Sequence, residues 1–249
     1  MKIPLKSAAE LEAMRVPCRM TAEVLKQVAE AVQPGVTTGE LDALARKIIG
    51  GMKAKPSFLG YNGYPGAICI SINDEVIHGI PGRRVVLPGD IVSLDVGVYY
   101  NGFNGDSATT VMVGVTDPDV IRLVETTKRA LEAALAVAKP GIHLSDVSHT
   151  VESIAEAAGC SVVREFVGHG VGRHLHEDPQ IPNYGAPGRG PILMPGMTLA
   201  IEPMVNLGRS EVVVLDDEWT VVTRDGKPSA HFEHTVAVLG ESVEILTLA

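Results

Sequence analysis

The sequence of 249 residues predicts an α+β fold made of two similar halves, roughly residues 1–113 and 114–249. Two pairs of matching segments support this prediction. A predicted helix ends at a Pro-Gly pair and a second helix follows, first at Pro34 and again at Pro140, 106 residues later. The segment LPGDIVSLDVG, with Pro88, is similar to MPGMTLAIEPM, with Pro195, 107 residues later. Pro-Gly after a helix is common, but two matches at nearly the same offset favour an internal duplication within one domain.

Helices are predicted at the start of each half. In the first half, Ser7 and Glu10 fit a capping box, and apolar residues then recur at helical spacing. Pro17 lies inside this segment and predicts a kink or a break. A second helix is expected to begin near Thr38. In the second half, TTKRALEAALAVAK (126–139) is a strong helix-forming segment, and another Pro-Gly and another helix follow it.

The composition argues against several classes of protein. The chain is 45% hydrophobic and 20% charged, which is typical of a globular protein. No segment approaches the about 18 apolar residues of a membrane span, and the N-terminus lacks the apolar run of a signal peptide, so we expect a cytoplasmic protein. The three cysteines are widely spaced and indicate neither a disulfide framework nor a CxxC zinc site. The net charge of −9 argues against a nucleic-acid groove.

Two aspartates occupy a predicted β-hairpin, SLDVGVYYNGFNGDSATT. Asn101-Gly102 is typical of a two-residue type I′ turn, and in that register Asp95 faces Ala108. Asp95 and Asp106 are then diagonal neighbours on one face, with β-carbons roughly 7–8 Å apart. Two converging carboxylates repel each other unless one is protonated or a cation lies between them. Taken alone, the pair favours a metal site and a structural polar pair equally.

Further candidate metal ligands lie in the second half. His169 belongs to the glycine-rich segment FVGHGVGRHLHEDP, Glu202 follows an apolar strand, and Glu233 lies within another, AHFEHTVAVL. A carboxylate in a strand suited to burial needs a partner. The duplication also places Glu202 at the position of Asp95, as expected if both halves contribute to one site. Two Asp, one His and two Glu suit Mn, Co, Fe or Zn, and two such ions about 3.5–4 Å apart would activate a water for hydrolysis.

Together these motifs resemble those of type I methionine aminopeptidases. The motifs, in order, are ISINDEVIHGIPG, SLDVGVYYNGFNGDSATT, GHGVGRHLHEDPQIPNYG, LAIEPM and FEHTVAVL, and the similarity covers essentially the whole chain. The resemblance implies the pita-bread fold, in which two pseudo-symmetric halves, with a curved antiparallel sheet covered by helices, surround a dinuclear metal site. Residues 1–249 would then form a single catalytic domain.

The resemblance also implies a role for individual residues. The implied metal ligands are Asp95, Asp106, His169, Glu202 and Glu233. Of these, Asp106 and Glu233 would bind both ions, and the ions would be Co, Mn, Fe or Zn. Glu202 would also be the general base toward the water that bridges the ions. His176 would stabilise the tetrahedral intermediate, and His78 would contact the scissile amide.

A pocket for a methionine side chain is implied as well. Its residues would be Phe58, Tyr61, Tyr64, Cys69, His78, Leu175, His176 and Trp219, each of which, taken alone, also fits ordinary core packing. Aromatic edges suit a thioether. The chain differs from the commonest pattern of the family at Phe58, Asn62, His174, Leu175 and His231, where Cys, His, Gly, an aromatic residue and Gln are usual. These differences leave open how large the second residue of the substrate can be.

The implied activity is removal of the initiator methionine from nascent proteins and peptides with a small second residue, by attack of a metal-bridging water. We expect a monomer that contacts the ribosome transiently and binds neither membrane nor nucleic acid. One alternative is an Xaa-Pro aminopeptidase or prolidase with the same ligands, although a helix that begins near Ser7 leaves no space for the large N-terminal domain of those enzymes. The other is a non-catalytic pita-bread protein that binds protein or RNA, although such proteins typically lose ligands.

Overall fold

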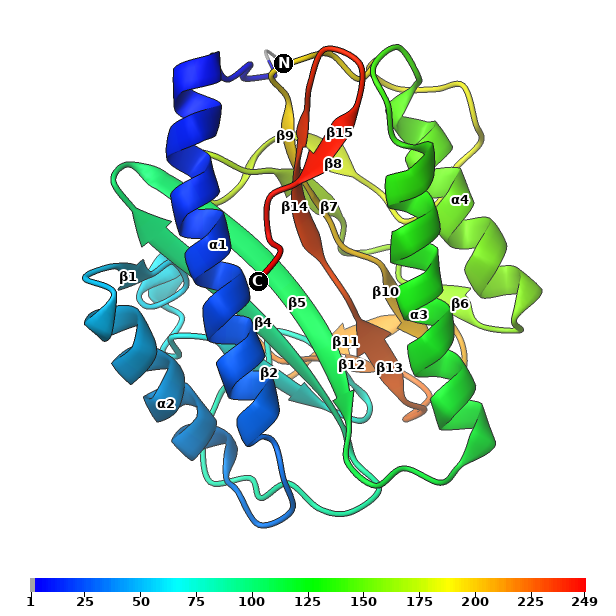
Figure 1. The fold of residues 1–249 in the computed structure, drawn as a ribbon. Helices are drawn as coiled ribbons and strands as arrows, with labels where there is room; N and C mark the ends of the chain where they lie inside the picture. The colour runs from blue at the N-terminus through cyan, green and yellow to red at the C-terminus, as the bar shows by residue number, and fades with distance from the viewer. Residues whose placement is uncertain (1–2) are drawn as a thin grey trace.

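The computed structural model describes residues 3–249, and it has the α+β architecture that the sequence predicts. Figure 1 shows the long helices on one side of the molecule and the strands behind them. The helices are α1 (Ala8–Ala31), α2 (Thr38–Gly51), α3 (Pro118–Val137) and α4 (Leu144–Ala157), with a 3-10 turn at Tyr61–Gly63. Each half therefore begins with two helices, an order expected from a duplication, which stays a prediction.

The strands pair in antiparallel fashion and form four sheets within the described residues. The sheet of the first half contains β1 (Lys55–Pro56), β2 (Cys69–Ile72), β4 (Ile91–Tyr100) and β5 (Phe103–Met112). The largest sheet of the second half has the order β15 (Val243–Ile245), β14 (His234–Val238), β9 (Thr198–Ile201), β7 (Gly168–Gly170) and β8 (Glu177–Ile181). Two three-stranded sheets complete the fold: β13 (Ser229–His231), β10 (Met204–Asn206) and β6 (Ser161–Val162), and β11 (Val212–Val214), β12 (Val221–Thr223) and β3 (Glu75–Ile77).

Helix α1 begins at the predicted cap and continues past its proline. Ser7 and Glu10 form the capping box. Pro17 lies inside the helix and is buried, so the predicted break does not occur. The reason lies in packing: a β-carbon on Gly105 of β5 would lie 2.6 Å from the Cα of Cys18, so the helix rests directly on the hairpin. Burial of the helix face against β5 offsets the hydrogen bond that proline cannot donate.

The hairpin of β4 and β5 has the predicted register. Asp95 pairs with Ala108, and the pairing continues without a bulge to the turn. Asn101 and Gly102 have φ values of 47° and 89°, the positive values that a type I′ turn requires. Asp95 and Asp106 therefore lie on the same face of the hairpin.

Each pair of helices covers its own apolar core. In the first half, Val28 of α1 and Leu41 of α2 pack with Leu94 of β4, and all three are fully buried. In the second half, Leu131 of α3 and Val151 of α4 pack in a separate cluster with the strands around β9. Cys18, Cys69 and Cys160 are buried and free, as their spacing predicts. No helix in residues 3–249 has the length and apolar character needed to cross a membrane.

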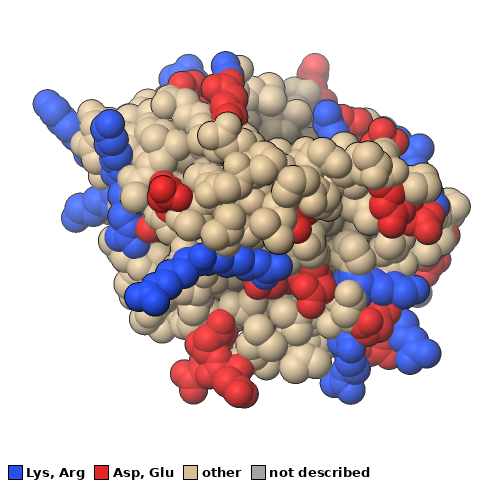
Figure 2. Space-filling view, turned by 90° about the horizontal axis from the view of Figure 1, so that it is seen from below, with Lys and Arg blue, Asp and Glu red and all other residues tan. Residues whose placement is uncertain are grey.

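The charges on the lower face are mixed. Figure 2 shows Lys and Arg side chains interspersed with Asp and Glu side chains over this face. The exposed apolar side chains of the protein include Leu87 and Met112.

The two halves meet where β5 runs beside residues 231–235, a contact that we call the seam. The backbone of Glu233 donates to the carbonyl of Ala108 over 3.0 Å, and the Ser107 hydroxyl donates to the carbonyl of Glu233 over 2.7 Å. The Thr235 hydroxyl donates to the carbonyl of Asp106 over 2.7 Å and accepts from its N–H over 3.1 Å. Side-chain hydroxyls thus complete the pairing between the halves, beside both Asp106 and Glu233.

We predict that Thr235→Val destabilises the protein by about 1–3 kcal/mol, because it leaves the buried N–H and C=O of Asp106 without their partner. Chemical denaturation of metal-free protein measures the change. Thr109→Val is the matched control, since Thr109 is half-buried on β5, the strand of Asp106, and its hydroxyl makes no hydrogen bond within the described residues. Equal stability of the two variants would contradict a structural role for the Thr235 hydroxyl.

Candidate metal centre

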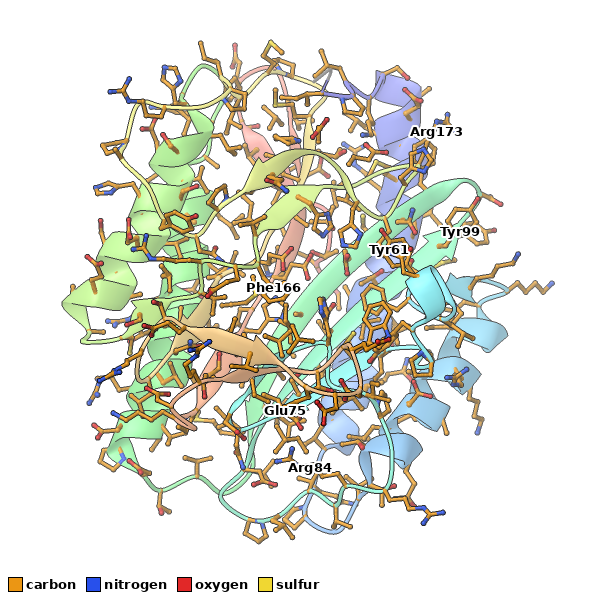
Figure 3. All side chains as sticks on the ribbon, turned by 180° about the vertical axis from the view of Figure 1, so that it is seen from behind. Tyr61, Glu75, Arg84, Tyr99, Phe166 and Arg173 are labelled. Carbon is orange, nitrogen blue, oxygen red and sulfur yellow. The ribbon has the colours of Figure 1, made fainter. Side chains whose placement is uncertain are left out.

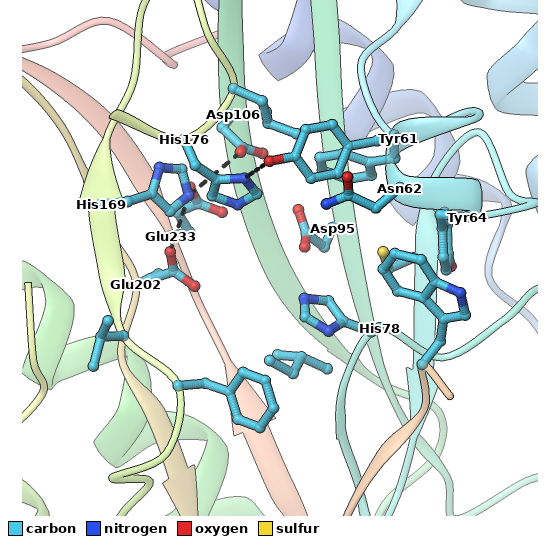
Figure 4. Close-up of a pocket in the computed structure, with 17 residues that line it drawn as sticks. Tyr61, Asn62, Tyr64, His78, Asp95, Asp106, His169, His176, Glu202 and Glu233 are labelled. Atoms are coloured by element: carbon cyan, nitrogen blue, oxygen red, sulfur yellow. Dashed lines mark hydrogen bonds and ion pairs between the residues drawn. The ribbon is translucent and has the colours of Figure 1, made fainter. Parts of the chain in front are cut away.

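A pocket with an empty volume of about 930 Å³ lies between the two halves, and Figure 4 shows the residues that line it. All five predicted metal ligands line it, each from a different segment. Asp95 lies on β4, Asp106 on β5 and His169 on β7, and Glu202 directly follows β9. Glu233 was predicted within a strand but lies between β13 and β14, where the chain leaves the ladder and crosses β5. This break directs its carboxylate into the pocket.

The imidazole of His169 presents a bare nitrogen to the carboxylates. Its Nδ1 lies 2.9 Å from the carbonyl oxygen of Gly170, which can only accept, so Nδ1 carries the ring proton. Burial, together with the charge of His176, lowers the pKa of His169 to about 3, so the ring is neutral. Nε2 then has a lone pair, yet it lies 3.4 Å from Glu202 Oε1 and 3.9 Å from Asp106 Oδ2. A lone pair facing two carboxylates is unfavourable unless a proton or a cation lies among them.

The four carboxylates share the same difficulty. Asp106 and Glu233 are only 3% and 2% exposed. Asp95 Oδ1, Asp106 Oδ1 and Glu233 Oε1 are buried, and none has a hydrogen-bond partner in the part of the chain that the structure describes. Burial first, and then the neighbouring carboxylates, raise the pKa values of Asp106 and Glu233 well above the usual range. Burial likewise raises the pKa values of Asp95 and Glu202.

These observations fit a divalent metal. Ligand atoms of Asp106, His169 and Glu233 all lie within 4.8 Å of one another. Carboxylate oxygens with one neutral imidazole form a donor set that suits Mn, Fe, Co or Zn. The Nδ1–H bond to a backbone carbonyl is the usual way in which a ligating histidine is oriented.

Two further histidines face the pocket from opposite sides. Nδ1 of His176 lies 2.7 Å from the hydroxyl of Tyr61, and its ring centroid lies 4.2 Å from that of His169. Figure 4 shows His78 below Asp95. The ring centroid of His78 lies 6.2 Å from that of Trp219. Burial lowers the pKa of His78 to about 4, so it is neutral. Its φ of 61° is unusual for a residue with a side chain, and such conformations often occur at functional sites.

The remaining wall of the pocket is apolar and aromatic. Every residue predicted for it lines the pocket, and Phe58, Tyr64, Cys69 and Leu175 form one buried cluster. Trp219 packs against this cluster, edge-on to Tyr64 with ring centroids 5.0 Å apart. The structure therefore brings the predicted carboxylates, histidines and apolar residues to a single pocket.

Sequence reasoning missed Ile77, Phe166 and Val167 of the lining, and it noted Asn62, which also lines the pocket, only as a departure from the family pattern. Phe166 meets His78 edge-on, with ring centroids 5.7 Å apart. The only signals in the sequence that could have found these residues were the adjacency of Ile77 to His78 and of Phe166 and Val167 to the Gly168-His169 motif. His231, which was noted only as a departure from the family pattern, lies with its Nε2 3.6 Å from Glu202 Oε2.

Comparison with known proteins identifies the same family along the chain. Residues 12–239 match metallopeptidase family M24. The chain is 51% identical over 242 residues to methionine aminopeptidase 1 of Bacillus subtilis (strain 168), and the alignment covers 97% of this chain and 98% of that protein. The crystal structure of methionine aminopeptidase from Thermotoga maritima matches with a TM-score of 0.98 and 48% identity, over 100% of both chains.

A more distant match shows how widely the fold is shared. Prolidase from Pyrococcus furiosus matches with a TM-score of 0.80 and 22% identity, over 98% of this chain and 65% of that chain. At that identity the likeness shows the fold alone. The predicted pita-bread fold is confirmed, and the match over nearly all of its length shows that this chain belongs to metallopeptidase family M24.

Proposed function

We propose that this protein is a metal-dependent aminopeptidase that removes the N-terminal methionine from peptides and nascent proteins whose second residue is small. The observation that carries the proposal is the Nε2 lone pair of His169. It faces two carboxylates, beside a pocket wall of aromatic and apolar side chains. The identity of 51% to a methionine aminopeptidase supports the same activity.

Two divalent ions are the cofactor that we propose, held by Asp95, Asp106, His169, Glu202 and Glu233. Four carboxylates balance the charge of two such ions. Asp106 and Glu233 are the two most deeply buried of these carboxylates and lie side by side at the seam, which suits ligands shared between two ions. When bound, the ions supply a water of lowered pKa and polarise the carbonyl of the scissile bond.

The side chains around the ions have separate tasks in the proposed mechanism. Glu202 takes a proton from the attacking water and delivers it to the leaving amine. Nδ1 of His176 lies 2.7 Å from the Tyr61 hydroxyl. In the proposed mechanism this hydroxyl donates to Nδ1, so that Nε2 carries the ring proton and donates to the developing oxyanion. His78 contacts the scissile amide. Because burial keeps both histidines neutral, neither adds a positive charge beside the ions.

The substrate side chain is proposed to fill the wall formed by Phe58, Tyr64, Cys69, Leu175 and Trp219. An unbranched thioether matches this wall in shape and polarisability, whereas a charged or β-branched side chain loses solvation or fit. Phe58, where Cys is usual, and Leu175, where an aromatic residue is usual, pack in one cluster. The larger side chain at Phe58 therefore compensates for the smaller side chain at Leu175.

We expect chelator-stripped protein to gain activity on titration with Mn or Co, with full activity near two equivalents, and to release methionine from Met-Ala-Ser but nothing from Ala-Pro-Ala. Chromatography of the released amino acid measures both reactions. Cleavage of Ala-Pro-Ala alone would assign the protein to the prolidase-like branch. Bound metal without cleavage of either peptide would leave only the non-catalytic alternative.

Glu202→Gln should lower kcat by about 10²- to 10⁴-fold, because the amide keeps the shape of the side chain but cannot accept the proton. The variant should still unfold cooperatively. Glu211→Gln, a change at an exposed position, is the matched control and should leave kcat unchanged. A Glu202→Gln variant with wild-type kcat would remove Glu202 from the role of base.

The stabilisation that metal provides should increase with pH. In the metal-free protein, burial raises the pKa of Asp95 to about 7 and that of Glu202 to about 8, whereas unfolded carboxyls titrate near pH 4. Between these values the folded state binds more protons, so metal-free stability falls as pH rises from about 4 to about 8. Metal displaces those protons. Scanning calorimetry should therefore show a larger gain in Tm on adding Mn at about pH 7.5 than at about pH 5.5. A gain that does not change with pH would contradict this linkage.

A further inference from the structure

The loop between β7 and β8, residues 171–176, carries Leu175 and His176 into the pocket. It contains Gly172 and has no regular structure, so its own backbone does not determine where His176 lies. The position of His176 therefore depends on contacts made by the rest of the chain with this loop.

A buried ion pair supplies one such contact. The ammonium of Lys6 touches Glu177 Oε2, and the two side chains are only 5% and 6% exposed. Glu177 directly follows His176, and its Oε1 accepts a hydrogen bond from the N–H of His174 over 3.1 Å. One carboxylate therefore holds the loop at two points, on either side of Leu175.

The loop and the N-terminal segment are shaped around this pair. A β-carbon on Gly172 would lie 2.5 Å from Cε of Lys6 and 2.8 Å from Glu177 Oε1, so only glycine leaves room for the ammonium. The backbone N–H of Lys6 donates to the carbonyl of Gly196 over 2.7 Å, which anchors the lysine independently of its side chain.

The loop has other contacts as well. The Tyr61 hydroxyl lies 2.7 Å from Nδ1 of His176 at an exposed position, and the remaining contacts address the far end of the loop. Asn104 donates from Nδ2 to the carbonyls of Gly172 and Arg173, over 3.0 and 3.3 Å. Arg173 pairs with Glu10 over 3.0 Å, but the two side chains are 60% and 32% exposed, so solvent screens the pair. Figure 3 shows Arg173 at the surface, beside the start of α1. Of these contacts, the Lys6–Glu177 pair is the one that is buried and adjacent to His176.

We propose that Lys6 and Glu177 are positioning residues, which place His176 and Leu175 in the pocket from outside it. This inference rests on the proposed function, because His176 there donates to the oxyanion. Neither Lys6 nor Glu177 lines the pocket or reaches the reacting atoms. Their effect is to hold the loop in one conformation, so that the Nε2–H of His176 meets the oxyanion without reorganisation.

The test compares the variants Glu177→Gln and Lys6→Met/Glu177→Met with the wild type, using holoenzyme throughout. The double variant leaves no charge buried, so it should fold at least as well as either single change. Arg15→Met/Glu244→Met is the matched control, because that partly buried pair also joins the N-terminal region to a distant strand but does not touch the loop. Hydrogen exchange over residues 172–177, and kcat and KM for Met-Ala-Ser, are the readouts.

We expect both test variants to exchange faster in residues 172–177 and to lose about 10- to 100-fold in kcat, with KM changed less than about twofold. The control should match the wild type in both readouts, whatever its thermal stability. Wild-type exchange and kcat in the double variant would overturn the proposal, and so would an equal loss of kcat in the control. If the double variant fails to fold, Glu177→Gln decides by the same criteria.

Hydrogen exchange needs no substrate, so it separates this inference from the proposed function. Unprotected loop amides in the variants, with a wild type that cleaves no peptide, would refute the function and leave the positioning of the loop intact. Unchanged exchange with an active wild type would refute the positioning alone.

Discussion

The seam between β5 and residues 231–235 is the contact on which the site depends. Asp106 and Glu233 belong to opposite halves, and the chain brings them together only because Ser107 and Thr235 use side-chain hydroxyls to complete the backbone pairing there. A continuous strand through residue 233 would keep Glu233 in regular alternation with its neighbours. The interruption between β13 and β14 instead allows its carboxylate to face Asp106. Each half has its own large apolar cluster, and a smaller one, in which Cys18 and Phe103 pack with Ala237, joins the two halves.

Electrostatics and packing act in opposite directions within the pocket. Burial of four carboxylates and a neutral imidazole costs solvation that no hydrogen bond in the described residues recovers for Asp95 Oδ1, Asp106 Oδ1 and Glu233 Oε1. A fold retains such groups when a ligand compensates them, and divalent ions do so here under the function that we propose. The apolar wall next to them excludes water from the pocket, which strengthens every remaining electrostatic interaction there.

Features that depend on interactions between residues close in the sequence could be predicted, whereas features that depend on contacts between distant segments could not. The register of β4 and β5 could be predicted because the Asn101-Gly102 turn determines it locally, and the cap of α1 because Ser7 and Glu10 are three residues apart. A kink or a break was expected at Pro17, and the break does not occur, since contact with Gly105 on a distant strand outweighed the local preference. The same limit applies to the ion pair of Lys6 and Glu177, which are 171 residues apart and carry no local signal.

Three features could be recognised from the amino-acid sequence alone: the α+β class, the placement of Asp95 and Asp106 on one face of a hairpin, and the motifs that mark the family. Turn chemistry, capping and motif identity all act within a few residues, so they can be recognised without the fold. Three other features became apparent only in the packed chain: which nitrogen of His169 faces the carboxylates, how Glu233 leaves its strand, and how Lys6 reaches the loop that carries His176. Each of these depends on groups that meet only when the two halves close on each other, because proximity in space between distant segments is a property of the packed chain.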